Sequence, residues 1–389
     1  MTPEEIAEVR PRLAEFAAGM LGGLARSDQR AAGELYVRGL LTDGRRKSMV
    51  PMAGRLGADH QRLQQFITSS TWDYAAVRAN VARWFAASGP VEALVVDDTG
   101  FPKDGSASPC VARQCSGTLG KIGNCQVGVS VHLVNEDASC AADWRLFCPE
   151  SWDDQALDDP VAAAGAARRR ERAGVPAQVR HTEKWRLAVE MIGEMTGPGG
   201  WGVLEQVTGG ARPVVVSDAG YGDNALFREE LTTAGWQYVV AVKGAASAYP
   251  HQATPQAVPY GGRGQPPKPA YPHPPANLRQ LAIASADQIQ PVTWRQGTKA
   301  TRGNPEAAMT SHFLAIRVRP ASRHIARQVM TRSVFDQWQG DHSWLIPRLG
   351  LDHFEGRSFT GWHRHVTLAA LAQAFCTLLR TDPKAPAPG

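Results

Sequence analysis

Two aspartates of this sequence each follow a short, strongly apolar run. Asp97 comes directly after residues 94–96 (LVV), and Asp218 comes directly after residues 214–217 (VVVS). An acid that leaves a buried strand lies at the edge of the sheet, where the sites of α/β proteins form. Carboxylate oxygens suit Mg²⁺ or Mn²⁺, and paired metal ions can activate water and stabilise the leaving oxygen of a phosphodiester. The pattern predicts a site for that chemistry, with turn formation or helix capping by the aspartates as the alternative.

The residues around these aspartates indicate a sheet with helices. Apolar Val and Leu alternate with smaller or polar residues over 127–133, which is typical of a strand with one buried face. Further strands are expected at 144–147, 214–216 and 238–242, and helices at 182–195 and 224–231. Antiparallel strands followed by strand–helix units predict a mixed α/β fold, a mixed sheet with helices on its faces. Because Asp97 and Asp98 are neighbours on a strand, their side chains point to opposite faces, and we expect only one to face a metal.

Other segments predict a helical beginning and a long insertion. Ile6, Val9, Leu13 and Phe16 recur at near-helical spacing, and a helix start is expected at Ser70–Thr71. Nine of the 27 prolines fall within residues 250–275, which excludes a helix or a central strand there. Strands are expected beyond this loop at 292–294 and 313–318, and a closing helix is expected at 366–380.

Composition excludes several classes of protein. The 389 residues are 43% hydrophobic and 20% charged, which indicates a soluble globular chain of about two or three domains. No apolar run reaches about 18 residues, so we expect no transmembrane helix and no membrane partner. The acidic, amphipathic N-terminus does not resemble a secretory signal. Six cysteines without a C-x-x-C pair disfavour a disulfide scaffold or a zinc site. A reducing, cytoplasmic setting is expected.

The charge of the chain is unevenly distributed. The net charge is +5, but residues 243–332 contain 12 Lys and Arg against two acids, Asp287 and Glu306. The rest of the chain is therefore net negative. A basic segment on a neutral to acidic body indicates a polyanionic partner, most often a nucleic acid, although a basic solvated surface is the simpler alternative.

Six ordered strings carry a resemblance to a known family. They are DDTGFPK (97–103), ARQCSGTLGKIGNCQVGVSVHL (112–133), WRLFCPESW (144–152), SDAGYGDN (217–224), WRQGTK (294–299) and GLDHFEGRSFTGWHRHVTL (350–368). With these strings the chain resembles the DDE-superfamily transposases of bacterial insertion sequences, over about residues 65–380. The resemblance implies an RNase H-like core with a strand-containing insertion. It also implies cleavage and strand transfer on double-stranded DNA, at transposon ends and at a target, with two Mg²⁺ or Mn²⁺ ions held by Asp, Asp and Glu.

The resemblance assigns two of the three acids and a domain plan. Asp97 matches the first aspartate of the DDT motif, and Asp218 matches the aspartate of the D-x-G-Y context. We expect such a protein to be associated with the nucleoid, and a homodimer on DNA is possible. The plan is an N-terminal helical domain at 1–88 with a possible role in DNA binding, the catalytic domain at 89–244 and 331–389, and the basic Pro-rich insertion at 245–330.

The third acid departs from the family pattern. Counting back from the GLDHFEG string, Gln339 falls where the family usually has its glutamate, and Ile346 falls where a lysine is usual. Two explanations are open. In the first, Glu355 or Asp341 supplies the third ligand, and Glu355 is our choice. In the second, the chain is a repurposed transposase with impaired catalysis that binds DNA. A neutral glutamine offers one carbonyl oxygen and no charge, so it is a poor metal ligand.

Basic residues in the matching strings are the candidates for phosphate contacts. The segment HFEGRSFTGWHRH (353–365) could bind phosphates, or it could be a capped helix start. The expected DNA contacts are Arg113, Lys121, Lys243, Arg295, Lys299, Arg357 and Arg364.

Overall fold

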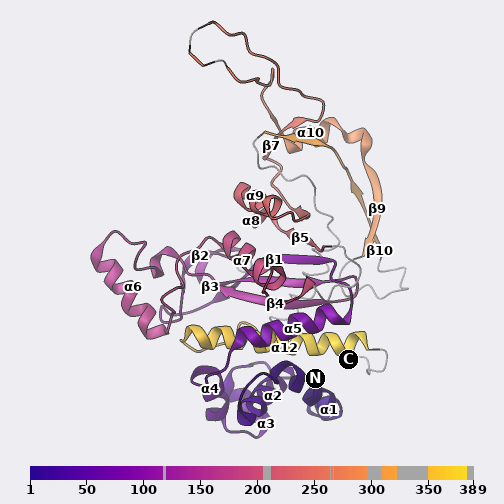
Figure 1. The fold of residues 1–389 in the computed structure, drawn as a ribbon. Helices are drawn as coiled ribbons and strands as arrows, with labels where there is room; N and C mark the ends of the chain where they lie inside the picture. The colour runs from indigo at the N-terminus through magenta and orange to yellow at the C-terminus, as the bar shows by residue number, and fades with distance from the viewer. Residues whose placement is uncertain are drawn as a thin grey trace. The chain divides into compact units, whose positions relative to one another are not determined.

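The computed structural model describes most of the chain (Figure 1). The chain divides into two compact units. The described residues are 1–116, 120–204, 212–262, 264–265, 267–295, 308–321 and 349–382. The first unit combines Met1–Pro213 with Trp338–Gly389, and the second is Val214–Gln337. The domain boundaries expected from the sequence stay a prediction.

The first unit begins with five helices, as the helical spacing predicts. They are α1 (Pro3–Leu21), α2 (Ser27–Leu41), α3 (Met49–Leu56), α4 (His60–Thr68) and α5 (Tyr74–Ser88). Thr2 and Glu5 form a capping box that begins α1, and the predicted apolar face of α1 is buried. The expected helix start at Ser70–Thr71 is two to three residues early, because Asp73 is the N-cap of α5 and its carboxylate accepts a hydrogen bond from the Ala75 N–H.

An antiparallel sheet forms the centre of the first unit. Its strands are β1 (Ala93–Pro102), β2 (Ala112–Ser116), β3 (Lys121–Val134) and β4 (Ser139–Leu146). The long β3 pairs with β1 on one side, and on the other side it pairs with β2 near its start and with β4 near its end. β1 and β3 stay in one register from Ala93↔Val134 to Pro102↔Cys125, so the faces of β1 alternate without interruption.

Helices cover both faces of this sheet. On one face, α5 and α12 (Phe359–Thr381) pack against β4, and α1 to α4 lie beyond them as a further layer (Figure 1). The indole of Trp362 on α12 lies 5.5 Å from the Phe101 ring of β1, which identifies the face of β1 that these helices cover. On the other face lies α7 (Lys184–Thr196), which contacts β3 and β4.

Three features of the first unit were not anticipated in the sequence. β2 and the helix α6 (Pro160–Ala173), which follows the short 3-10 turn at Glu150–Trp152, have no predicted counterpart. α6 lacks an apolar stripe, since its buried residues are two alanines and an arginine. Its ends do carry signals: Asp159 is the N-cap, and Gly174 ends the helix at φ 62°. α12 begins seven residues before the expected 366, because Ser358 caps it.

The second unit contains a parallel strand pair and a strand-containing insertion. β5 (Val214–Ser217) and β6 (Tyr238–Val240) are parallel and are joined through α8 (Ala219–Gly222) and α9 (Ala225–Thr233). The remaining elements are β7 (Ser247–Pro250), β8 (Ala276–Asn277), α10 (Leu278–Ala284), β9 (Gln290–Arg295), β10 (Ala308–Phe313) and β11 (Val318–Pro320). Together the two units have the mixed α/β fold that the sequence predicts.

The Pro-rich stretch has no helix in its described residues, as its composition predicts. Between β7 and β8 the described residues form one isolated bridge, between Gln256 and Ala270. The strand expected at 292–294 lies within β9. The strand expected at 313–318 is wrong, because β10 ends at Phe313 and β11 begins at Val318.

Candidate active site

Asp97 and Asp98 interrupt an otherwise buried stretch of β1. Residues 93–96 before them are buried, and so is Thr99 after them, whereas both aspartates are partly exposed. Asp97 pairs with Ser130 of β3, and its Oδ1 accepts a hydrogen bond from the Asp98 N–H at 2.6 Å. The sequence predicts that the strand ends at Asp97. This prediction is wrong, because the pairing of β1 with β3 continues to Pro102. The acid therefore stands in mid-strand.

The two aspartates point to opposite faces of the sheet. Asp97 lies on the same side of the strand as Phe101, which is the side covered by α12. Asp98 points to the side of α7, where its Oδ2 accepts a hydrogen bond from Lys184 Nζ. The Asp98 side chain is only 13% exposed, so this ion pair satisfies a carboxylate that is largely removed from water.

Lys184 occupies an unusual position for a cation. It is the first residue of α7, and the N-terminal end of a helix carries a partial positive charge that disfavours lysine. The Asp98 carboxylate offsets this repulsion, whereas the carboxylate of the N-cap residue Glu183 pairs with Arg186. Lys184 was not among the residues that the sequence singled out. The combination of a lysine at a helix start and an acid in a strand is the signal that could have indicated the pair.

Asp218 lies in the second unit, at the junction of β5 and α8. It follows the buried Ser217 and is the N-cap of α8, and its Oδ1 accepts a hydrogen bond from the Gly220 N–H at 2.9 Å. The capping role that the sequence left open is therefore present. Capping is compatible with metal binding, since a carboxylate has two oxygens and several lone pairs.

Glu355 lies on the surface, in the segment before α12. Its side chain is 64% exposed, and its Oε1 lies 3.6 Å from Arg46 Nη1, which forms a weak surface pair. Lys103, at the end of the DDTGFPK string, donates a hydrogen bond from Nζ to the Phe354 carbonyl at 2.7 Å. Burial lowers the pKa of Lys103, and Asp352 and Glu355 oppose that shift. Lys103 therefore ties the end of β1 to the segment that carries Glu355.

The donor chemistry of these acids fits a hard divalent cation, but a complete ligand set is not assembled in the described residues. In the part of the chain that the structure describes, no three His, Cys, Asp or Glu side chains form a group that could hold a metal ion. Asp97 and Glu355 belong to the first unit and Asp218 to the second. Gln339, Asp341 and Ile346 lie outside the described residues. The assignment of Asp97, Asp218 and Glu355 as metal ligands stays a prediction.

The basic candidates differ in their exposure. Arg113, Lys121 and Arg357 are exposed in the first unit. Lys243 is exposed in the second unit, and its Nζ lies 3.0 Å from Asp223 Oδ2. Arg295 is in β9, but its side chain is outside the described part, and Lys299 lies outside the described residues altogether.

Arg364 has a structural role instead of the surface role that we had expected. It is 5% exposed, and its guanidinium donates hydrogen bonds to the carbonyl oxygens of Ile67 and Trp72, at 3.0 and 3.2 Å. The guanidinium also lies 5.2 Å from the Trp72 ring centre. Ser358 caps α12, so the capped helix start is present, whereas Arg357 of the same segment is exposed.

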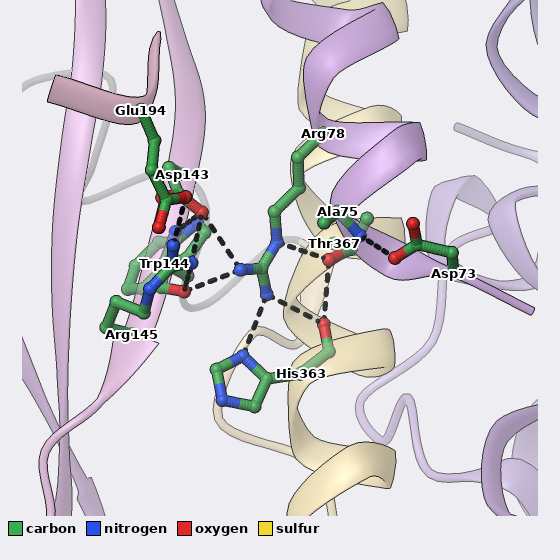
Figure 2. A network of polar contacts seen from close by, with 9 residues as sticks. All are labelled: Asp73, Ala75, Arg78, Asp143, Trp144, Arg145, Glu194, His363 and Thr367. Atoms are coloured by element: carbon green, nitrogen blue, oxygen red, sulfur yellow. Dashed lines mark hydrogen bonds and ion pairs between the residues drawn. The ribbon is translucent and has the colours of Figure 1, made fainter. Parts of the chain in front are cut away.

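A buried polar network around Arg78 was not anticipated in the sequence (Figure 2). Nη1 of Arg78 donates to Asp143 Oδ1 at 2.9 Å, Nε donates to Thr367 Oγ1 at 2.7 Å, and Nη2 donates to His363 Nδ1 at 3.0 Å. The network joins α5, β4 and α12. Burial and the charge of Arg78 lower the pKa of His363 well below its usual value, so this imidazole is neutral and accepts the bond. The available signal was Arg78 and Asp143 among the mostly apolar residues of α5 and β4.

Comparisons with known proteins show which family the chain belongs to. Residues 19–301 match the family described as "DDE superfamily endonuclease", and the chain belongs to this family. The mixed α/β architecture is consistent with the RNase H-like fold of such enzymes. A segment of 99 residues is 35% identical to a protein of Microchaete diplosiphon named "Probable transposase for insertion sequence element IS701".

The similarity to the Microchaete diplosiphon protein is partial. The match covers 25% of this chain and 26% of that relative.

Among the described residues, no helix is both long and apolar enough to cross a membrane.

Proposed function

We propose that this protein is a DDE transposase that hydrolyses phosphodiester bonds at the ends of an insertion sequence and transfers the DNA strands. Membership of the DDE endonuclease family and the partial similarity to a transposase support the proposal. The observation that carries it is Asp97, a partly exposed carboxylate in the middle of a buried strand. The packing of a buried strand does not favour a carboxylate at this position, whereas a metal site requires one.

The residues of this chain have distinct roles in the proposed reaction. Asp97 and Asp218 would hold Mg²⁺ or Mn²⁺, with Glu355 as the third acid. A bound metal pair supplies an activated water and stabilises the leaving oxygen. The N–H of Asp98 orients the Asp97 carboxylate, and the N–H of Gly220 orients the Asp218 carboxylate. Lys184 neutralises Asp98, so that the adjacent acids of the DDT motif do not repel each other.

Substitution of the two aspartates tests the proposal. We expect Asp97→Asn and Asp218→Asn each to reduce Mg²⁺-dependent nicking of DNA with the element's ends by about 100-fold or more, since each removes a charged ligand. DNA affinity without metal should change by less than about twofold, because neither residue supplies a cation. Asp104→Asn is the matched control, since this exposed acid lies in the loop after β1. Nicking that persists in both variants rejects the assignment.

A second candidate function is a DNA-binding derivative of the same scaffold that does not cleave. The observation that favours it is Gln339, which stands where the family usually has a glutamate. Gln339→Glu should increase nicking if the site lacks only this charge, and the increase should disappear when Asp97→Asn is added. If wild type and Gln339→Glu both fail to nick but bind DNA in a salt-dependent manner, the second function is supported.

A further inference from the structure

The segment between β4 and α7 carries a helix that faces solvent on most sides. In Figure 1, α6 extends beyond the end of the sheet where β2 and β3 pair. Among its residues, only Ala166, Arg170 and Ala173 are buried. α6 therefore adds little to the core of the first unit.

This helix is nevertheless fixed to the sheet by its own loop. Trp152 Nε1 donates a hydrogen bond to the Val111 carbonyl at 2.8 Å, directly before β2. The buried guanidinium of Arg170 donates to the carbonyls of Trp152, Pro176 and Val179, at 3.2, 3.0 and 2.6 Å. These bonds to backbone atoms, together with the ion pair of Arg170 Nε and Asp154 Oδ1 at 3.2 Å, set the position of α6 relative to β2.

Two further arginines of α6 take no part in this anchoring. Arg168 and Arg172 are exposed, and among the residues that the structure describes neither has a hydrogen-bond or ion-pair partner. In contrast, Arg169 donates to the Ser151 carbonyl at 2.6 Å and lies over the Trp152 ring. Residues four apart lie on one side of a helix, about 6 Å apart along its axis. The two guanidinium groups therefore form a pair of available cations on one rigid side.

The surroundings of this pair suit an extended polyanion. The preceding turns contain small residues, with Ala164 exposed and Val161 76% exposed, so a large partner can approach the helix closely. Arg113 of β2 is also exposed, two residues after the Val111 anchor. Guanidinium groups bind phosphates through paired N–H donors, and contacts of this kind position a protein on a duplex without reading its sequence.

We propose that Arg168 and Arg172 bind the phosphate backbone of double-stranded DNA, so that α6 is a positioning surface for the duplex. The inference rests on the proposed function, because it takes its partner from an enzyme that acts on DNA. It concerns residues other than the proposed acidic ligands, and it needs no metal.

The test measures DNA affinity as a function of salt. The double variant Arg168→Gln/Arg172→Gln should bind a duplex of about 30 base pairs about tenfold more weakly than the wild type does, at about 100 mM salt and without metal. The slope of log affinity against log salt should fall by about 2, since each lost phosphate contact removes about 0.9. Arg168→Lys/Arg172→Lys should keep the slope, because it keeps the charge. Glu171→Gln, between the two arginines, should tighten binding.

The outcomes separate this inference from the proposed function. If the wild type fails to bind any duplex at low salt, the proposed function fails with it. If the wild type binds and the glutamine variant has the same slope, only the role of α6 fails. Arginines in the last turn also stabilise the helix through its dipole, so thermal unfolding is measured in parallel. A lower melting temperature with an unchanged slope assigns Arg168 and Arg172 to helix stability alone and overturns the inference.

Discussion

At the scale of single residues, His365 shows how one side chain can make a fold sensitive to acid. Its Nε2 lies 3.1 Å from the carbonyl oxygens of Gly350 and Leu351, so this nitrogen carries the proton and donates. Its Nδ1 lies 2.8 Å from the Tyr36 hydroxyl and therefore accepts. Burial lowers the pKa of His365 to about 4, which keeps the ring neutral.

This pKa predicts a loss of stability in acid. The unfolded chain binds a proton at His365 near pH 6.5, whereas the folded chain resists it down to about pH 4. The contribution is therefore complete above pH 6.5 and is lost as the pH falls from there toward 4. Between about pH 7.5 and pH 5 we expect the free energy of unfolding to fall by about 2 kcal/mol from this residue.

Urea unfolding at the two pH values measures that contribution. His365→Gln should be less stable than the wild type at neutral pH, since the glutamine cannot reproduce all three contacts. Its stability should change less between the two pH values, by the same ~2 kcal/mol, because it cannot titrate. Equal pH dependence in the two proteins would show that His365 does not titrate as its burial requires.

At the scale of elements, the Arg78 network holds a helix pair against a strand. Arg78 of α5, Asp143 of β4 and His363 of α12 are all buried, and one guanidinium connects all three elements. Asp143 also accepts a hydrogen bond from Arg145, whose guanidinium pairs with Glu194 of α7. Polar contacts thus extend from the helices on one face to the helix on the other.

Removal of the arginine should be costly, because it leaves buried partners behind. We expect Arg78→Met to lower the free energy of unfolding by about 3–5 kcal/mol, the cost of breaking a buried ion pair from one side. Arg186→Met is the matched control: Arg186 lies on α7 and pairs with Glu183 at the surface, so its loss should cost about 1 kcal/mol or less. Chemical denaturation measures both. A similar cost for the two variants would contradict the role of the network.

At the scale of the whole molecule, the sequence predicts the elements with strong patterns better than those without. Residues 127–133 alternate and lie in β3, although both faces of this stretch are buried and not only the one face that the alternation predicts. The Pro-rich stretch has no helix in its described residues. The sequence does not predict α6, because this helix is anchored by Arg170 and buries only two alanines, so it has no apolar periodicity. The site follows the same rule. The sequence pattern indicates Asp97 as a candidate, whereas the pairing of Lys184 with Asp98 depends on how α7 packs on the sheet and has no pattern in the sequence.

The late position of α12 in the sequence determines how the first unit folds during synthesis. α12 is buried along most of its length and packs on α2, α5 and β4, yet it begins only at Phe359. While the ribosome is still translating the second unit, the sheet and the N-terminal helices lack the helix that covers their shared apolar surfaces. The unit must therefore complete its folding late, and a gene copy truncated before this helix encodes a chain with an exposed, aggregation-prone interior.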